Sequence, residues 1–286
     1  MRLNRRDSIR LFGGGLGLAF FGAPSLSFGQ GSDTLTVAMD EVPKKLDPLL
    51  YQTNPGYRTM LNVFDTLINV DYGGDGSLKP GLAKSWSRVD GKTLDLTLRD
   101  DVVFHDGSPL TVEDVVASLG PKRLTDADSP GLGVAKQFLA TLASVEARDS
   151  KTVRVTSKVT DPTLELRLTA WGSQIINKAA FEKLGWEGFA QAPVGTGAYQ
   201  VVSIAPDSLV LKAFPKYWGG EPKITNIVFR SAPELSSRIA SLRSGDFDLS
   251  VDVPTDQFSA VTASDNLEIV GGTIAESGIS TIGIAQ

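Results

Sequence analysis

The sequence predicts a mixed α/β protein. Three segments, at 33–41, 92–104 and 151–159, alternate apolar and polar residues, as strands with one solvated face do. Between residues 223 and 251 a strand pattern, a helical pattern and a second strand pattern follow one another, which is the order of an α/β layer. The 286 residues are 41% apolar, enough for the core of one large domain or of two modest ones.

The first predicted elements are a strand, a loop and a helix. The strand at 33–41 places alternate residues from Leu35 to Met39 on one face, and a proline-rich loop spans 43–55. The helix is predicted at 57–71 because its apolar residues recur at helical spacing. These residues are Met60, Leu61, Phe64, Leu67 and Ile68.

The middle of the chain begins with the strand at 92–104. A helix is predicted at 111–119, where Thr111 and Asp114 have the spacing of a capping box. The further elements are a surface loop at 122–133, a helix at 137–145, a strand at 151–159 and a mostly helical stretch at 164–185, broken near Gly172.

The last region begins near Val194. Its predicted strands are 195–206 and 207–215, which form a hairpin, then 223–232 and 247–251. Between the last two strands we expect a helix that starts with a second capping box, Ser231 to Glu234, and ends at Gly245.

Composition narrows the classes of function. The net charge is −5; since residues 1–29 hold four arginines and one aspartate, a net +3, the remainder carries −8. An acidic body without a Lys/Arg cluster argues against a nucleic-acid partner. The absence of cysteine excludes disulfides, thiolate zinc sites and a cysteine nucleophile, and there is only one histidine. We therefore expect no metal site and no cofactor.

Residues 1–29 have the pattern of an export signal. Basic residues up to Arg10 precede a weakly apolar run at 11–23 that is too short to span a membrane, and small residues follow, with cleavage plausible after Gly29. The pair Arg5-Arg6 partly matches a twin-arginine signal, although Ser8 stands where a bulky apolar residue is expected. The twin-arginine and general routes both stay open.

Five phrases in fixed order resemble one family. They are LKPGLAKSW at 78–86, the run 90–119, VGTGAYQ at 194–200, FPKYWGGEPKITNIVFR at 214–230 and SRIASLRSGDFDLS at 237–250. Together they resemble the extracellular solute-binding proteins of ABC importers, family 5, the peptide-, dipeptide- and nickel-binding type. The resemblance covers nearly all of the chain after the export signal.

The resemblance implies the α/β fold of a type II-like periplasmic binding protein, in which the ligand lies between two lobes. It implies a discontinuous first lobe, 30–70 with 193–286, and a flanking α+β subdomain at 71–192. Family members are substantially longer than this sequence. We therefore expect the second lobe to be absent, as in a fragment, a truncated product or half of a split protein.

The function implied by the resemblance is capture of peptides or other small solutes in the periplasm, for delivery to ABC permease subunits. It implies neither an enzyme nor a transmembrane protein. Loops facing the ligand supply the candidate contacts. Asp40 could pair with a ligand ammonium group, although in the family that role usually falls to the second lobe. The candidates are Met39, Asp40, Tyr51, Gln52, Thr53, Asn54, Trp171, Gly195, Thr196 and Gly197.

Two other functions stay open from the residues alone. One is an exported hydrolase acting through carboxylates, although neighbours such as Asp100 and Asp101 on a strand point to opposite faces and the sequence has none of the common catalytic motifs. The other is a lobe that binds unfolded polypeptide. The single histidine, His105, stands at a strand end before an Asp-Gly turn, and we interpret it as structural.

Overall fold

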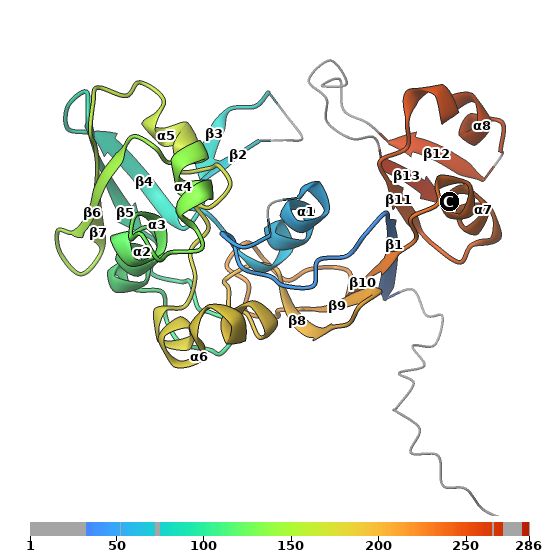
Figure 1. Ribbon diagram of the computed structural model, residues 1–286, viewed down its shortest axis with the longest axis horizontal. Coiled ribbons are helices and arrows are strands. Elements are labelled where there is room, and N and C mark those ends of the chain that lie inside the picture. The colour runs from blue at the N-terminus through green and yellow to red at the C-terminus, as the bar shows by residue number, and fades with distance from the viewer. Residues whose placement is uncertain (1–32, 52, 72–74, 265, 271–281, 286) are drawn as a thin grey trace, which may run out of the picture. The chain divides into compact units, whose positions relative to one another are not determined.

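The computed structural model describes residues 33–51, 53–71, 75–264, 266–270 and 282–285. The predicted export signal at 1–29 lies outside these residues. The described residues form a mixed α/β structure (Figure 1).

A seven-stranded sheet has the order β12-β13-β11-β1-β10-β9-β8. Its central strand, β1, pairs in parallel with β10 and β11, whereas the other pairs are antiparallel. The strands are β1 (Thr34–Met39), β8 (Tyr199–Ile204), β9 (Ser208–Ala213), β10 (Asn226–Ser231), β11 (Leu249–Val251), β12 (Leu267–Val270) and β13 (Ile282–Ala285).

Two helices accompany the parallel strands. Helix α1 (Asn54–Val63) follows β1, and α7 (Leu235–Ser244) connects β10 to β11. A 3-10 turn (Thr255–Gln257) and α8 (Phe258–Thr262) precede β12. Buried apolar residues of β1, α1, β9 and β10 form one core.

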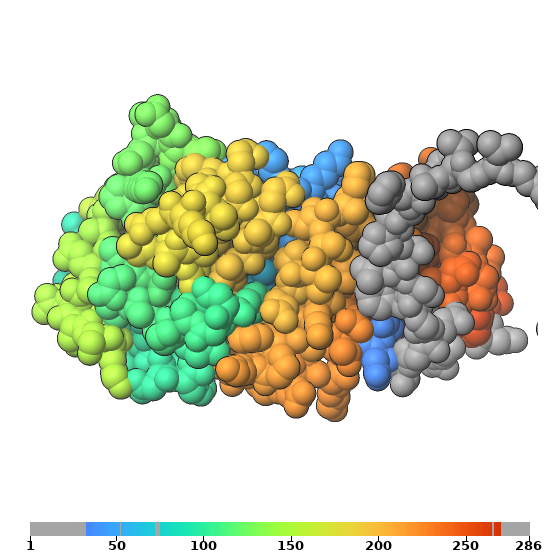
Figure 2. All heavy atoms as spheres, turned by 90° about the horizontal axis from the view of Figure 1, so that it is seen from below, coloured from blue at the N-terminus to red at the C-terminus, as the bar shows by residue number. Residues whose placement is uncertain are grey.

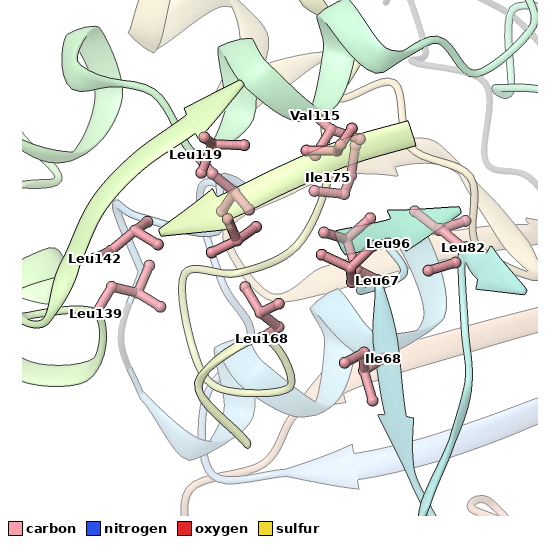
Figure 3. Packing of buried hydrophobic residues seen from close by; sticks show 14 of the residues in the cluster. Leu67, Ile68, Leu82, Leu96, Val115, Leu119, Leu139, Leu142, Leu168 and Ile175 are labelled. Carbon is pink, nitrogen blue, oxygen red and sulfur yellow. The ribbon is translucent and has the colours of Figure 1, made fainter. Parts of the chain in front are cut away.

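A second, four-stranded sheet has the order β4-β5-β7-β6, and β2 pairs with β3. Its core includes Leu96, Val115 and Leu168 (Figure 3). The strands are β2 (Ile68–Val70), β3 (Leu78–Pro80), β4 (Ala83–Arg88), β5 (Thr93–Leu98), β6 (Leu142–Ala147) and β7 (Thr152–Ser157). The helices are α2 (Val112–Ser118), α3 (Pro121–Leu124), α4 (Leu132–Phe138), α5 (Leu164–Arg167) and α6 (Lys178–Gln191). Figure 2 shows the surface of α6 (yellow) continuing into that of the strands that follow it (orange). The predicted boundaries of lobe and subdomain stay a prediction.

The strands predicted from alternation are confirmed as β1, β5 and β7, but the one predicted at 92–104 is too long, because β5 ends at Leu98 and Asp100, Asp101 and His105 lie beyond it. The predicted hairpin is confirmed as β8–β9, and β10 and β11 lie where strands are expected. The capping box of α2 is also confirmed. The Asp114 N–H donates to the Thr111 hydroxyl at 3.4 Å, and the Thr111 N–H donates to the Asp114 carboxylate at 2.9 Å.

The helix predicted at 57–71 is wrong in its C-terminal half, because α1 ends at Val63. The Leu82 and Ala83 N–H groups donate to the carbonyls of Thr66 and Leu67 at 3.0 Å, so tertiary hydrogen bonds hold this segment extended before β2. Phe64, Leu67 and Ile68 are buried, as the helical pattern predicts, but they lie in this extended segment and at the start of β2.

Four other predictions are corrected. The helix at 137–145 is wrong, because α4 ends at Phe138 and β6 pairs with β7 from Leu142; the loop at 122–133 overlaps the ends of α3 and α4. The stretch at 164–185 is helical only in α5 and in the first residues of α6, and the predicted break at Gly172 lies between these helices. The second capping box does not form, because the Ser231 hydroxyl instead donates to the Asp40 carbonyl at 3.1 Å and α7 has no side-chain cap.

A buried ion pair joins the loop after β1 to α3. The side chains of Arg123 and Asp47 are 2% and 0% exposed, and the guanidinium donates to the two carboxylate oxygens at 3.0 and 3.1 Å. The rings of Phe181 and Trp186 lie 4.6 and 4.7 Å from the guanidinium carbon. A buried charge is tolerated only when it is paired, so this contact fixes the loop against α3 and α6.

The glycine turn Gly195–Gly197 packs against the end of α1. The Gly197 N–H donates to the Val63 carbonyl at 2.9 Å. A Cβ atom at Gly195 would lie 2.0 Å from the Val63 carbonyl oxygen, and one at Gly197 would lie 2.5 Å from the Asn62 carbonyl oxygen. Only glycine permits this approach between two backbones.

His105 joins the second sheet's side of the chain to the same turn. The backbone N–H of His105 donates to the Gly195 carbonyl at 2.9 Å. The Gly195 N–H donates to Nδ1 at 3.4 Å, so the ring proton is on Nε2, which donates to the Gly197 carbonyl at 2.9 Å. Burial lowers the pKa of His105 below its usual 6.5, because a charged ring would lose its hydration. These bonds give His105 a structural role, as its sequence context predicts.

Replacing Gly195 with alanine is expected to destabilise the protein by about 1–3 kcal/mol or more, because the new methyl group overlaps the Val63 carbonyl. The matched control is Gly133→Ala in α4, where a Cβ meets nothing within 4 Å and where alanine should stabilise the helix by about 0.5–1 kcal/mol. Urea unfolding measures both. Equal midpoints for the two variants would show that the turn does not need glycine.

His105 should also make stability depend on pH. Below about pH 6.5 the unfolded chain binds a proton that the folded chain, with its lowered pKa, does not bind. Stability is therefore fully present above 6.5 and declines as pH falls toward the folded pKa, with a slope of at most about 1.4 kcal/mol per pH unit.

The measurement is urea unfolding of the native protein and of His105→Gln between pH 7.5 and 5.0. Because the chain has one histidine, the difference between the two pH profiles isolates this ring. The variant should be less stable at pH 7.5 and should lose less stability on acidification. Parallel profiles would contradict the proposed protonation state.

Candidate ligand-binding site

Three parallel strands end at the same edge of the seven-stranded sheet. Met39 of β1 pairs with Ser231 of β10, and Ala38 pairs with Ser250 of β11. The residues just beyond these strands, including Asp40 and Asp252, therefore lie along that edge. In α/β sheets, ligands bind outside the carboxyl ends of parallel strands, so this edge is the candidate site.

Four residues lie close together in the segment after β1: Asp40, Glu41, Tyr51 and Thr53. Burial raises the pKa of the Tyr51 hydroxyl, as do its hydrogen bond to Glu41 and the negative charges of Glu41 and Asp40, while a hydrogen bond with Thr53 opposes them. The phenol therefore stays protonated and can donate to Glu41. Asp40 and Glu41 are exposed, whereas Tyr51 and Thr53 are half-buried. The arrangement offers two carboxylates and a hydroxyl to a ligand.

The start of α1 adds amide and aromatic groups. The Thr53 hydroxyl caps the helix by accepting from the Gly56 N–H at 3.2 Å, and Asn54 begins the helix with an exposed side chain. One turn later Tyr57 stacks on Trp171, with ring centroids 4.8 Å apart. The structure thus brings Trp171 to the helix that carries Thr53 and Asn54, by a contact far apart in sequence.

Two residues at this edge were missed by sequence reasoning. Arg58 of α1 donates two hydrogen bonds to the Asp252 carboxylate, the longer at 2.8 Å. Asp252 has φ 57°, the only positive φ at a described residue other than glycine, and such strain occurs where the surroundings enforce it. The pair ties α1 to the end of β11. No local pattern links residues so distant in the chain.

Other predicted site residues have interior positions. Met39 is 0% exposed and belongs to the core. Gly195 and Gly197 are buried in the turn against α1, and the Thr196 hydroxyl, 0% exposed, donates to the Asp65 carboxylate at 2.9 Å. Their side chains are not at the surface. Gln52 lies outside the described residues.

Asp65 contacts the glycine turn through a buried hydrogen bond to Thr196. Its carboxylate accepts hydrogen bonds from the Thr196 hydroxyl and from Trp218 Nε1, each at 2.9 Å. Burial raises the pKa of Asp65, and these hydrogen bonds oppose that rise. The network is structural, because all of its polar atoms satisfy one another.

Within the described residues, no group of three His, Cys, Asp or Glu side chains could hold a metal ion. The same part of the chain has no helix with the length and apolar character needed to cross a membrane.

Comparison with known proteins gives the same class of fold. The family model described as "Bacterial extracellular solute-binding proteins, family 5 Middle" matches residues 77–284. A solved structure of MoaA from A. tumefaciens R10, in complex with mannopinic acid, is 30% identical with a TM-score of 0.74 and covers 84% of this chain and 49% of that chain. The predicted fold of a periplasmic binding protein is thereby confirmed.

Two relatives of known sequence are named as binding proteins. The nickel-binding periplasmic protein of Escherichia coli K12 is 29% identical over 220 residues, which are 76% of this chain and 41% of the relative. The glutathione-binding protein GsiB of Salmonella typhi is 31% identical over 200 residues, which are 68% of this chain and 38% of the relative. The chain spans less than half the length of these relatives. It belongs to the bacterial extracellular solute-binding proteins of family 5.

Proposed function

We propose that this chain captures a small solute, with peptides as the first candidate class, for an ABC importer. Its partners would be that solute and the permease subunits of the importer. It would act in the periplasm after export through the signal at 1–29, by the twin-arginine or the general route, and without catalysing a reaction. The observation that carries this proposal is the family match over residues 77–284.

The chemistry at the strand edge favours a ligand with an amino group. Asp40 is an exposed carboxylate beside Glu41, and a ligand ammonium can make charge-assisted hydrogen bonds with such groups. The Asn54 amide has both donors and an acceptor and so suits a peptide backbone. Trp171 and Tyr57 present aromatic surface next to it.

The ten predicted residues divide into two roles in this proposal. Direct side-chain contacts come from Asp40, Tyr51, Thr53, Asn54 and Trp171, and Gln52 belongs to the same loop. The buried residues Met39, Gly195, Thr196 and Gly197 hold the strand and the helix in position.

A ligand panel tests the function. Short peptides, opines and nickel–histidine complexes are added to the protein, and the melting temperature and the ligand concentration are followed. A ligand at 100 times its Kd stabilises the folded state by about 2.7 kcal/mol, a rise of roughly 5–10 °C for a chain of this size. Consumption of a ligand would overturn the proposal in favour of a hydrolase, and binding of unfolded polypeptide alone would favour the polypeptide-binding alternative.

Asp40→Asn should weaken the binding of an amine-bearing ligand about two- to five-fold, the range of a solvent-exposed ion pair. The affinity for the N-acetylated form of the same ligand should not change. Calorimetry at low salt measures both, and Asp207→Asn, which alters another exposed aspartate, at the β8–β9 turn, is the control. Equal losses for the amine and its acetylated form would show that Asp40 does not contact the amino group.

A further inference from the structure

A cavity of about 260 Å³ lies in the part of the chain built on the four-stranded sheet. It is formed by the end of α2, by α3, by one face of α4 and by the first residues of β6. None of the candidate-site residues described above lines it. Its lining residues are Leu119, Pro121, Leu124, Thr125, Leu132, Ala135, Lys136, Leu139, Ala140, Leu142, Ala143, Ser144, Val145 and Lys158.

The cavity results from local features of α4 and β6. Leu132, Ala135 and Lys136 of α4 and Leu139, which caps its C-terminus, recur at the spacing of a single helix face. The pairing of β6 with β7 shifts register between Leu142 and Ser144, which leaves Ala143 as the extra residue of a β-bulge. Alanines at 135, 140 and 143 leave space that larger side chains would fill.

Part of the cavity wall is apolar and buried. Leu119, Leu124 and Leu139 are each at most 3% exposed, and Val145 is also buried. Figure 3 shows Leu139 and Leu142 together at one end of the apolar cluster that they share with Leu119. A ligand here would meet these aliphatic side chains together with polar groups of the lining such as Thr125 and Ser144.

The charge of the lining has one sign. Lys136 and Lys158 are its only charged residues, and both are exposed, whereas no acidic residue lines the cavity. The Lys158 ammonium donates to the Ala140 carbonyl at 2.9 Å, which holds it beside the bulge. An ammonium group has three donors, so it can make further bonds to a ligand. A partly apolar wall with two cations suits an anion that carries an apolar body.

We propose that this cavity binds a small carboxylate with an apolar body, such as a medium-chain fatty acid. The carboxylate lies at Lys136 and Lys158, and the hydrocarbon contacts Leu119, Leu124 and Leu139. The volume is just below the usual range of about 300–1,000 Å³ for drug-sized ligands, so the occupant is smaller than those. This site is separate from the proposed transport function and does not depend on it.

The probe is a series of straight-chain carboxylates from butanoate to decanoate, measured by calorimetry. Each methylene that enters the cavity should tighten binding about four-fold, until the cavity is full and the gain stops. Octanamide, which has the same body without the charge, should bind more weakly than octanoate. Nuclear Overhauser effects between octanoate and leucine methyl groups, assigned with Leu119→Val and Leu139→Val, locate the ligand.

Variants distinguish the contribution of the lysine charges to binding from that of the cavity volume. Lys136→Gln and Lys158→Gln should each weaken octanoate binding about two- to five-fold and leave octanamide unaffected. Ala143→Leu, at an exposed position, should fill the entrance and abolish binding of both. Lys122→Gln, an exposed lysine of α3 outside the lining, is the control and should change nothing; circular dichroism verifies folding of each variant.

Three results would overturn the proposal. One is the absence of binding by every carboxylate at millimolar concentration. Another is equal affinity for octanoate and octanamide, which would show a cavity that does not recognise anions. The third is octanoate binding that persists unchanged in a folded Ala143→Leu variant, which would place the ligand elsewhere.

Discussion

The close contact between the glycine turn and the end of α1 is the constraint on which the rest of the structure depends. The Val63 carbonyl ends α1 and accepts from the Gly197 N–H at 2.9 Å. Gly195 lies so close to the same carbonyl that no Cβ atom fits. His105 hydrogen-bonds to the turn from the chain segment after β5, and Asp65 does so from the segment after α1. One short turn therefore joins parts of the molecule that are distant in sequence.

This contact also sets the candidate ligand-binding site at the opposite end of α1. A helix of ten residues is about 15 Å long, so the contact at Val63 helps to position Thr53 and Asn54 at its other end. The Arg58–Asp252 pair adds a second attachment, to the end of β11. The buried turn residues thus act on the strand edge through the helix, whereas Asp40 and Tyr51 are held by β1 and its loop.

Sequence patterns predicted the features whose causes are local. Alternation identified β5 and β7 because each has one buried face, and the Thr111–Asp114 box depends on residues three apart. The end of α1 could not be predicted, because its apolar pattern continues to Ile68 and the interrupting hydrogen bonds come from Leu82 and Ala83. The contacts of Tyr57 with Trp171 and of Arg58 with Asp252 could not be predicted, because they join segments that only the tertiary fold brings together.

Helix α4 contacts Trp171 of the candidate site on one side and lines the cavity on another. Its residue Phe138 lies 5.6 Å from Trp171, whose other neighbour, Tyr57, is on α1, while Leu139 lines the cavity with two lysines. The strand edge carries the carboxylates Asp40 and Glu41 and favours a cation. Because the charges are opposite, a ligand suited to one region is disfavoured at the other. A helix of seven residues is held mainly by tertiary contacts, so an occupant of the cavity would stabilise the same helix that supports Trp171.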